Sequence, residues 1–207
     1  HVQELCQRAY RVVVWLDPTK HNELERIASE LGQLSQLQFV IPLITPCSSP
    51  APELKSWNET TQRQTTFLSQ LTALFPQTQC VFLRDVLEFD ALSPLAQMLE
   101  QMPQKQLFAP ELSIAPCSLQ LALDQMQHFI FHPSRSSIVI QGTELSCETL
   151  LSQAKTLYEN IHQVQIALTT IAVATVELIP FHVSLEQVRF SLDDFLKKYS
   201  KTLPSPQ

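Results

Sequence analysis

Glycine is the residue this sequence lacks most clearly: the 207 residues include only Gly32 and Gly142. Loops that bind the phosphates of nucleotides need several glycines, because backbone N–H groups must come close to the phosphate oxygens. The segment after the first predicted strand is Asp17-Pro18-Thr19-Lys20, which has no glycine at all. We therefore expect no dinucleotide or nucleotide-triphosphate loop, and we predict no cofactor.

Charge is scarce as well, and positive charge is not clustered. Charged residues make up 16% of the chain, and the formal net charge is −6. A nucleic-acid binder needs a cationic surface that displaces counterions from phosphates. The densest group of lysines, at 197–201, lies at the end of the last predicted helix, where cations complement the helix dipole. We therefore predict no nucleic-acid partner.

Cysteine pairs and long apolar runs are also missing. The five cysteines are isolated along the sequence, which predicts buried free thiols in a reducing compartment and hence a cytoplasmic location. No apolar run reaches the roughly 20 residues that a membrane-spanning helix needs, so we predict no membrane insertion by this segment. Because the chain begins at His1 and not at Met, we expect it to be a fragment of a longer protein.

Apolar β-branched runs alternate along the chain with segments of helical periodicity. Continuous apolar runs predict strands covered on both faces, as in a parallel sheet. The predicted strands lie at 11–16, 37–44, 79–83, 137–141 and 170–178, with a possible short strand at 106–109. The predicted helices lie at 21–31, 58–75, 93–102, 118–132, 146–161 and 184–199.

This alternation predicts an α/β fold. We expect three layers, with a mostly parallel sheet of about five strands flanked by helices, Rossmann-like but without a nucleotide loop. The simplest domain organisation is a single domain over residues 1–207, and the irregular stretch at 103–116 is the one candidate boundary for a subdivision.

Four local predictions concern single segments, and those for Pro42 and for 166–179 leave an alternative open. Pro42 removes one ladder donor from its strand, which indicates an edge position or a bulge. The Pro- and Ser-rich stretch 45–52 is predicted to be a surface loop. The segment 166–179 has the β-branched content of a strand but the length of a continued helix, and we prefer a strand. The pattern Ser184-Leu185-Glu186-Gln187 is a capping box, which predicts the start of the final helix.

Two carboxylates form the first candidate site. Asp17 follows the first predicted strand and Asp85 follows the third. In open parallel sheets ligands bind beyond the carboxyl ends of the strands, and carboxylate oxygens are ligands for Mg²⁺. Asp17 and Asp85 are therefore candidate metal ligands. The alternative is that Asp17 caps the following helix and that Asp85 begins a turn, as Asp commonly does at such boundaries.

A histidine pair and the thiols are weaker candidates for chemistry. His128 and His132 have the spacing that places two side chains on one helix face, where they could ligate zinc. Histidines at the end of a helix are also favoured by the dipole, without any metal. Cys47 and Cys80 have no recognisable histidine partner, so we predict no catalytic residue among them.

Trp57, Leu54 and Pro52 form a third candidate site, because an exposed Trp beside prolines is a common anchor for a partner protein. The alternative is that Trp57 folds back onto its own helix. With no catalytic motif, we predict a non-catalytic protein-interaction or scaffold domain of a larger complex, bound to another protein. The alternative is a divalent-metal-dependent phosphohydrolase-like or phosphotransfer-like domain that uses Asp17 and Asp85.

Overall fold

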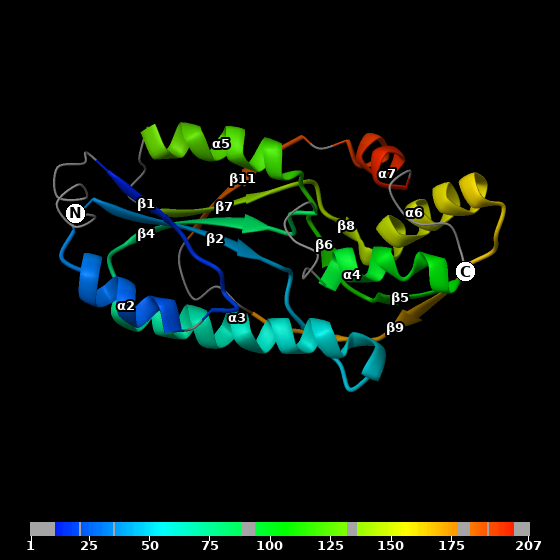
Figure 1. The fold of residues 1–207 in the computed structure, drawn as a ribbon, viewed down its shortest axis with the longest axis horizontal. Coiled ribbons are helices and arrows are strands. Elements are labelled where there is room, and N and C mark those ends of the chain that lie inside the picture. The colour runs from blue at the N-terminus through cyan, green and yellow to red at the C-terminus, as the bar shows by residue number, and fades with distance from the viewer. Residues whose placement is uncertain are drawn as a thin grey trace.

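Five parallel strands form the central sheet of the computed structural model, which describes residues 11–20, 22–34, 36–87, 94–131, 136–177, 183–189 and 191–200. The order across the sheet is β1-β2-β4-β7-β11, as Figure 1 shows in part. The strands are β1 (Val12–Trp15), β2 (Leu37–Leu43), β4 (Gln79–Arg84), β7 (Ser137–Gln141) and β11 (Val183–Gln187). The order across the described sheet follows the order along the chain, with no reversal.

Helices cover both faces of this sheet, which confirms the predicted three-layer α/β fold. Helices α2 (Asn22–Leu31) and α3 (Lys55–Leu74) lie on one face, and α5 (Leu119–Phe131) lies on the other (Figure 1). Side chains along a strand alternate between the two faces. On β2, Phe39 therefore packs into the core below α2 and α3, while Val40 packs into the core on the α5 side.

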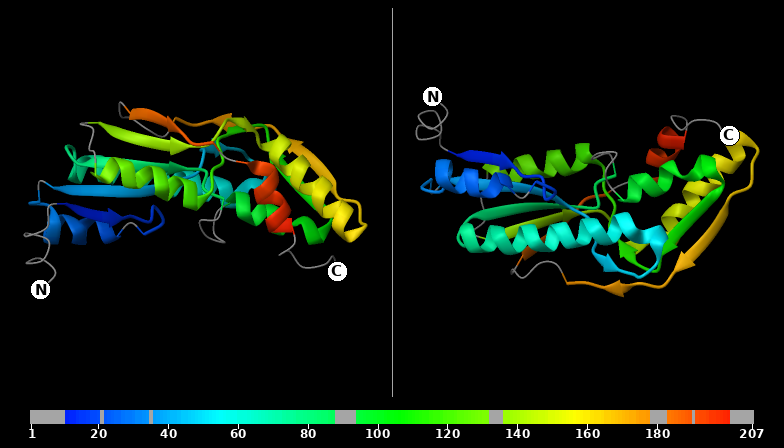
Figure 2. Two further views of the ribbon diagram at one scale, coloured as in Figure 1. Left: turned by 90° about the horizontal axis from the view of Figure 1, so that it is seen from above. Right: turned by 60° about the horizontal axis from the view of Figure 1, so that its bottom comes forward.

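The rest of the chain forms a distal lobe beyond the carboxyl ends of the strands (Figures 1 and 2). The lobe has a core of its own, which also includes Leu54 and Trp57 from the start of α3. Its elements are α4 (Pro94–Glu100), η2 (Met102–Gln104), β5 (Gln106–Pro110), β6 (Ser113–Ile114), β8 (Leu145–Ser146), α6 (Cys147–His162), β9 (Ala167–Ile171) and α7 (Leu192–Ser200).

The fifth strand of the sheet is not the predicted one. Residues 170–178 were expected there, but β9 pairs with β5 in the distal lobe, and β10 (Ala174–Thr175) pairs with β3 (Cys47–Ser48). The capping-box segment at 184–187 instead forms β11, which pairs with β7 in parallel register. The prediction of a helix start there was wrong, because pairing with a buried strand outweighs a local capping pattern.

Two further local predictions were wrong. Strand β2 is interior, between β1 and β4. The backbone of Val40 faces β1 and pairs with it. Pro42 lies two residues further on, so its backbone faces the same side, but β1 has already ended there. The missing N–H of Pro42 therefore interrupts no pairing with β1. The stretch 45–52 is not simply a surface loop: it contains β3 and begins the η1 turn (Pro52–Leu54), and Thr45 and Cys47 are buried in it.

Within the described residues, none of the helices is long and apolar enough to span a bilayer. The stretch 103–116 contains η2, β5 and β6, and a division of the chain at this point stays a prediction.

Candidate ligand site at the carboxyl edge of the sheet

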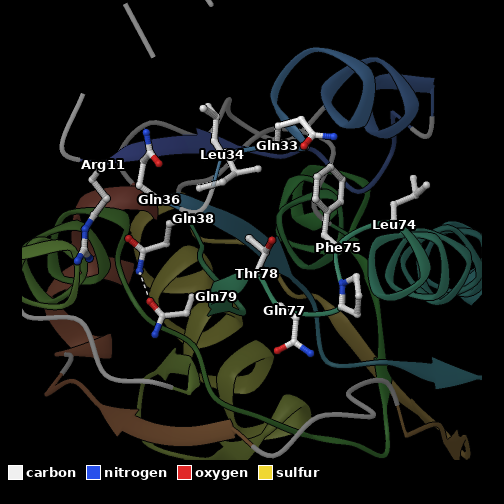
Figure 3. Close-up of a pocket in the computed structure, with 13 residues that line it drawn as sticks. Arg11, Gln33, Leu34, Gln36, Gln38, Leu74, Phe75, Gln77, Thr78 and Gln79 are labelled. Carbon is white, nitrogen blue, oxygen red and sulfur yellow. Dashed lines mark hydrogen bonds between the residues drawn. The ribbon is translucent and has the colours of Figure 1, made fainter. Parts of the chain in front are cut away.

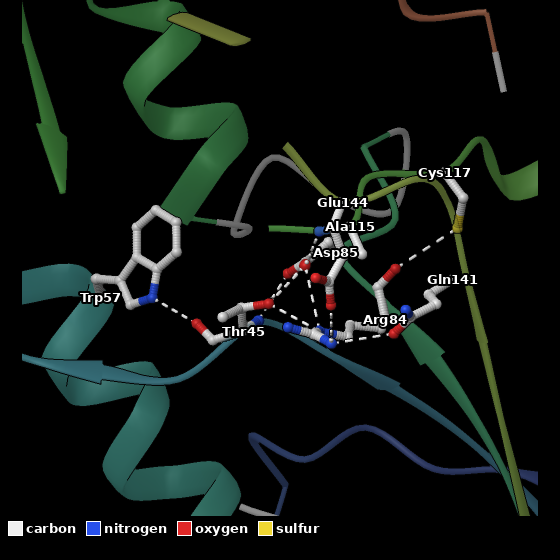
Figure 4. A network of polar contacts seen from close by, with 8 residues as sticks. All are labelled: Thr45, Trp57, Arg84, Asp85, Ala115, Cys117, Gln141 and Glu144. Atoms are coloured by element: carbon white, nitrogen blue, oxygen red, sulfur yellow. Dashed lines mark hydrogen bonds and ion pairs between the residues drawn. The ribbon is translucent and has the colours of Figure 1, made fainter. Parts of the chain in front are cut away.

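Asp85 is the centre of a polar network at the carboxyl end of β4 (Figure 4). Its carboxylate is 4% exposed and accepts three hydrogen bonds: from the Thr45 backbone N–H (2.6 Å), the Thr45 hydroxyl (2.6 Å) and the Ala115 backbone N–H (2.9 Å). The backbone of Asp85 has a φ of 51°, in the left-handed region that Asp tolerates better than most residues. This bend turns the side chain back across the end of the sheet.

Arg84 extends the network toward β7. Its Nε donates to the Thr45 hydroxyl (2.8 Å), and its Nη1 donates to the Gln141 side-chain oxygen (3.0 Å). Its ion pairs reach Asp85 at 3.6 Å and the more exposed Glu144 at 3.7 Å. One guanidinium thus lies between two carboxylates, so the cluster carries a formal charge of about −1. Such a cluster has no surplus positive charge with which to bind a phosphate group.

Trp57 holds the same network from the side of α3. Its indole Nε1 donates to the Thr45 carbonyl (2.8 Å), and the side chain is 1% exposed. Thr61, one turn further along α3, accepts a hydrogen bond from the Cys47 N–H (3.2 Å). Helix α3 therefore fixes the segment that follows β2, and with it the two donors that Thr45 offers to Asp85. The network is preorganised before any ligand arrives.

Two buried thiols lie close to this network. Burial raises the pKa of Cys47 from its usual value of 9.0 to about 11. Burial also raises the pKa of Cys147, and the negative charge of Asp85 adds to that rise. A thiol with a raised pKa is protonated at neutral pH and is a poor nucleophile. We therefore assign no nucleophilic role to either one.

A groove of about 220 Å³ opens beside Arg84 and Gln141, between β2, β7 and β11. The rest of its lining is apolar: Leu43, Ile44, Pro46, Val139, Val176, Val183 and Leu185. Leu185, on the edge strand, is 64% exposed. The groove therefore offers an apolar wall that a ligand can cover and a polar end where a ligand can form hydrogen bonds. Its volume is below the ~300–1,000 Å³ of pockets for drug-sized ligands, so it suits a single ring system.

Asp17 and Asp85 occupy different surroundings. Asp17 accepts hydrogen bonds from the N–H and the hydroxyl of Thr19, and it pairs with Lys20 across 3.7 Å. Because β2 lies between β1 and β4, the ends of those two strands are separated by roughly 10 Å. Both carboxylates already face donors, and among the described residues no group of three His, Cys, Asp or Glu side chains could hold a metal ion. A metal role for this pair stays a prediction.

The other predicted site residues are placed as follows. Trp57 and Leu54 are buried in the core of the distal lobe, and Pro52 is exposed. His128 lies exposed on α5, with its ring 5.8 Å from that of Phe129, whereas His132 lies outside the described residues. A partner-binding role for the Pro52 segment stays a prediction.

The network also contains residues that no sequence pattern had singled out: Thr45, Arg84, Gln141 and Glu144. The available signal was their position, since Thr45, Arg84 and Gln141 each end or follow a predicted strand, and parallel strands end at one edge.

The fold and this edge define a class: an open parallel α/β sheet with a groove at the carboxyl ends of its strands. Comparison with protein-family models and with curated proteins finds no match. Among solved structures, the chain is similar to the enzyme WbmH from Bordetella bronchiseptica in complex with NAD⁺. The TM-score is 0.51 and the identity 9%, over 86% of this chain and 64% of that one. This similarity shows the fold.

A second similar structure is a nucleoside-diphosphate-sugar epimerase from Staphylococcus aureus. The TM-score is 0.44 and the identity 14%, over 97% of this chain and 65% of that one. The chain thus spans less than two thirds of the length of either protein.

The likeness to the NAD⁺-bound enzyme corrects the functional prediction. We expected a non-catalytic interaction or scaffold domain, with a metal-dependent phosphohydrolase as the alternative. The fold is instead one that an NAD⁺-bound enzyme carries, in a Rossmann-like arrangement. The functional prediction rested on the scarcity of glycine and of charge and on the absence of catalytic motifs, and none of these excludes the fold of an enzyme.

The described residues do not fit a whole dinucleotide. A pyrophosphate needs free backbone N–H groups at the first strand–helix turn. Here the Thr19 N–H donates to the Asp17 carboxylate at 2.9 Å, and the turn has no glycine. The groove at Arg84 is also smaller than a dinucleotide requires.

Proposed function

We propose that this chain binds a nucleoside as the nucleoside-recognition part of an enzyme. The single ring system of the base lies in the groove beside Arg84 and Gln141. The observation that carries the proposal is the composition of the groove: apolar walls on three strands, with a guanidinium and an amide at one end. Apolar walls accommodate the faces of a flat heterocycle, and the polar end can pair with its edge. The fold that the chain shares with an NAD⁺-bound enzyme supports the same ligand class.

The charge of the network decides against recognition of the phosphates. Arg84 is paired with Asp85 and Glu144, so a phosphate group would meet two carboxylates for one guanidinium. We therefore expect a nucleoside to bind about as well as its nucleotide. The free energy of binding comes mainly from covering the exposed wall at Leu185.

The test is isothermal titration calorimetry of the chain with adenosine, uridine, AMP and NAD⁺. We expect saturable binding of a nucleoside, and affinity at least about tenfold weaker in a Leu185→Glu variant, because a carboxylate replaces part of the apolar wall. Leu185 is exposed, so the change does not disturb the core. Ile161→Glu on α6, which also replaces an exposed apolar side chain, is the matched control and should bind like the wild type.

Two outcomes would contradict this proposal. One is the absence of binding by every nucleoside. The other is AMP or NAD⁺ binding more than about 100-fold tighter than the nucleoside, which would mean that the phosphates are recognised after all.

We also propose that the protein works in a reducing compartment, the cytoplasm. Cys47, Cys80, Cys117 and Cys147 are buried free thiols in the structure. Thiol titration in denaturant, on protein isolated from its source without reductant, should find every cysteine reduced. A disulfide among these four would contradict the proposal.

A further inference from the structure

A second cavity lies at the opposite edge of the sheet, where β2 and β4 begin and where α2 and α3 end (Figure 3). Its volume is about 740 Å³, within the range of pockets for small organic ligands. It is lined by Arg11, Gly32, Gln33, Leu34, Gln36, Leu37, Gln38, Leu74, Phe75, Pro76, Gln77, Thr78 and Gln79. This cavity is remote from Arg84 and has no part in the function proposed above.

Uncharged amides dominate the chemistry of this lining. Five of the lining residues are glutamines, and each glutamine side chain offers two N–H donors and an acceptor oxygen. Arg11 is the one lining residue with a full charge, and the described lining contains no Asp or Glu. The lining therefore offers many donors and acceptors with little net charge.

Gln38 gives the cavity an unmet hydrogen-bonding requirement. Its side chain is only 5% exposed, and its Oε1 is buried without a partner. Its Nε2 donates to the Gln79 side-chain oxygen at 3.4 Å, which is long for such a bond. Figure 3 shows the two amides side by side, with the Gln38 oxygen turned away from Gln79. An unpaired buried oxygen costs free energy, which a ligand donor would recover.

Rotation of the Gln38 amide can present this oxygen to the cavity. The last torsion of a glutamine is broad, with no steep barrier between orientations. The rotation gives up the long contact with Gln79, and the Gln79 amide must turn as well, because its own oxygen would otherwise face the Gln38 oxygen. A donor from a ligand can then reach an acceptor that the protein itself leaves unpaired.

We propose that this cavity binds a neutral polyhydroxylated ligand with the chemistry of a small sugar. A hydroxyl group both donates and accepts, so it can pair with either end of each amide. A cation would find no carboxylate here, and a polyanion would find a single guanidinium. Leu74, which is 42% exposed, and Pro76 supply apolar surface for the C–H face of a sugar ring.

The experiment is a titration of ¹⁵N-labelled protein with glucose and with maltose, followed by the side-chain amide signals in NMR spectra. We expect saturable shifts of the Gln38 and Gln79 amides. In a Gln38→Leu variant, binding should weaken by at least about tenfold. The melting temperature of this variant should not fall, because the substitution removes a buried oxygen that has no partner. Gln120→Leu, at an exposed position on α5, is the matched control and should leave binding unchanged.

A Gln77→Ala variant provides a second test that does not depend on the fold, because Gln77 is exposed on the cavity rim. It should also weaken sugar binding. The proposal is overturned if neither sugar shifts these amides, if Gln38→Leu and Gln77→Ala both bind sugar like the wild type, or if spermidine or inorganic phosphate binds at these amides more tightly than the sugars do.

Discussion

The two edges of the sheet differ in how their polar groups are used. At the carboxyl edge, hydrogen bonds join Asp85 and Arg84 to three other parts of the chain, at Thr45, Ala115 and Gln141. At the amino edge, neutral amides surround a larger cavity, and Gln38 keeps an oxygen without a partner. The carboxyl edge is built of charges that satisfy one another, whereas the amino edge leaves hydrogen-bonding capacity unused.

This difference shows how charged and neutral groups differ as partners for a ligand. A buried charge must be paired within the protein, because an unpaired one is too costly to keep. Charged clusters are therefore saturated before a ligand arrives, and ligand recognition falls to the neutral groups and apolar surface beside them. An unpaired uncharged amide costs less free energy than an unpaired charge, so a protein can leave it unpaired until a ligand binds.

The only two glycines of the chain lie at these two edges, and they give the largest expected contrast. A Cβ at Gly142 would stand 1.8 Å from the Pro116 carbonyl oxygen in a buried turn. A Cβ at Gly32 would stand 2.4 Å from the Ala28 carbonyl oxygen at an exposed helix end. We expect Gly142→Ala to lower the free energy of unfolding by about 3 kcal/mol and Gly32→Ala by about 1 kcal/mol, as measured by urea denaturation. Equal losses would show that the carboxyl edge is no more tightly packed than the amino edge.

The carboxylates at the strand ends give the next contrast. Asp85→Asn keeps the shape and tolerates the left-handed backbone, but it places an NH₂ group against donors from Thr45 or Ala115. We expect a loss of about 2 kcal/mol in the free energy of unfolding. Asp17→Asn, at an exposed turn, should cost about 0.5 kcal/mol. If Asp85→Asn were instead more stable than the wild type, relief of repulsion in an ion site would be indicated.

Thiol ionisation gives the smallest contrast. Burial raises the pKa of Cys80, at the amino edge, from 9.0 to about 12, and that of Cys47, at the carboxyl edge, to about 11. The stabilising effect is complete below pH 9 and is lost as the pH rises toward these values, because the unfolded thiol releases its proton first. At pH 9.5 the loss is below about 1 kcal/mol for each thiol.

Comparison of urea unfolding at pH 8 and pH 9.5 measures this loss. Cys47→Ala and Cys80→Ala should each show a smaller pH-dependent decrease than the wild type. A decrease that is unchanged in both variants would mean that other groups cause it.

The layers of the fold could be predicted from sequence because they rest on local patterns. The buried runs of β2, β4 and β7 lie within two residues of the predicted bounds, since continuous apolar segments leave few alternatives. The partner of a strand is not encoded locally. Residues 167–171 are apolar enough for the central sheet, yet they pair with β5 in the distal lobe. Residues 183–187 satisfy a capping pattern, yet they complete the sheet beside β7.

The candidate site was predictable only in part, for the same reason. Asp85 was identified from its position after a strand. Its role depends on Thr45, 40 residues earlier, and on Ala115, 30 residues later. Sequence shows a carboxylate but not the donors that reach it, so a saturated carboxylate and a metal ligand look alike. Gln38 had no signal at all, because an orphaned oxygen is a property of the packed structure.

The strand order β1-β2-β4-β7-β11 has a consequence for synthesis on the ribosome. Because spatial neighbours follow one another along the chain, each strand of the central sheet leaves the ribosome after the neighbour on which it is to pair. The sheet can therefore grow from one side during translation, with β1, β2 and β4 assembled first. Among the pairings of the described strands, that of β10 with β3 spans the longest stretch of sequence, more than a hundred residues, so it closes the longest loop. A pause in translation before β10 would therefore leave β1, β2, β4 and β7 assembled, while Cys47 and Ser48 still lack their partner strand.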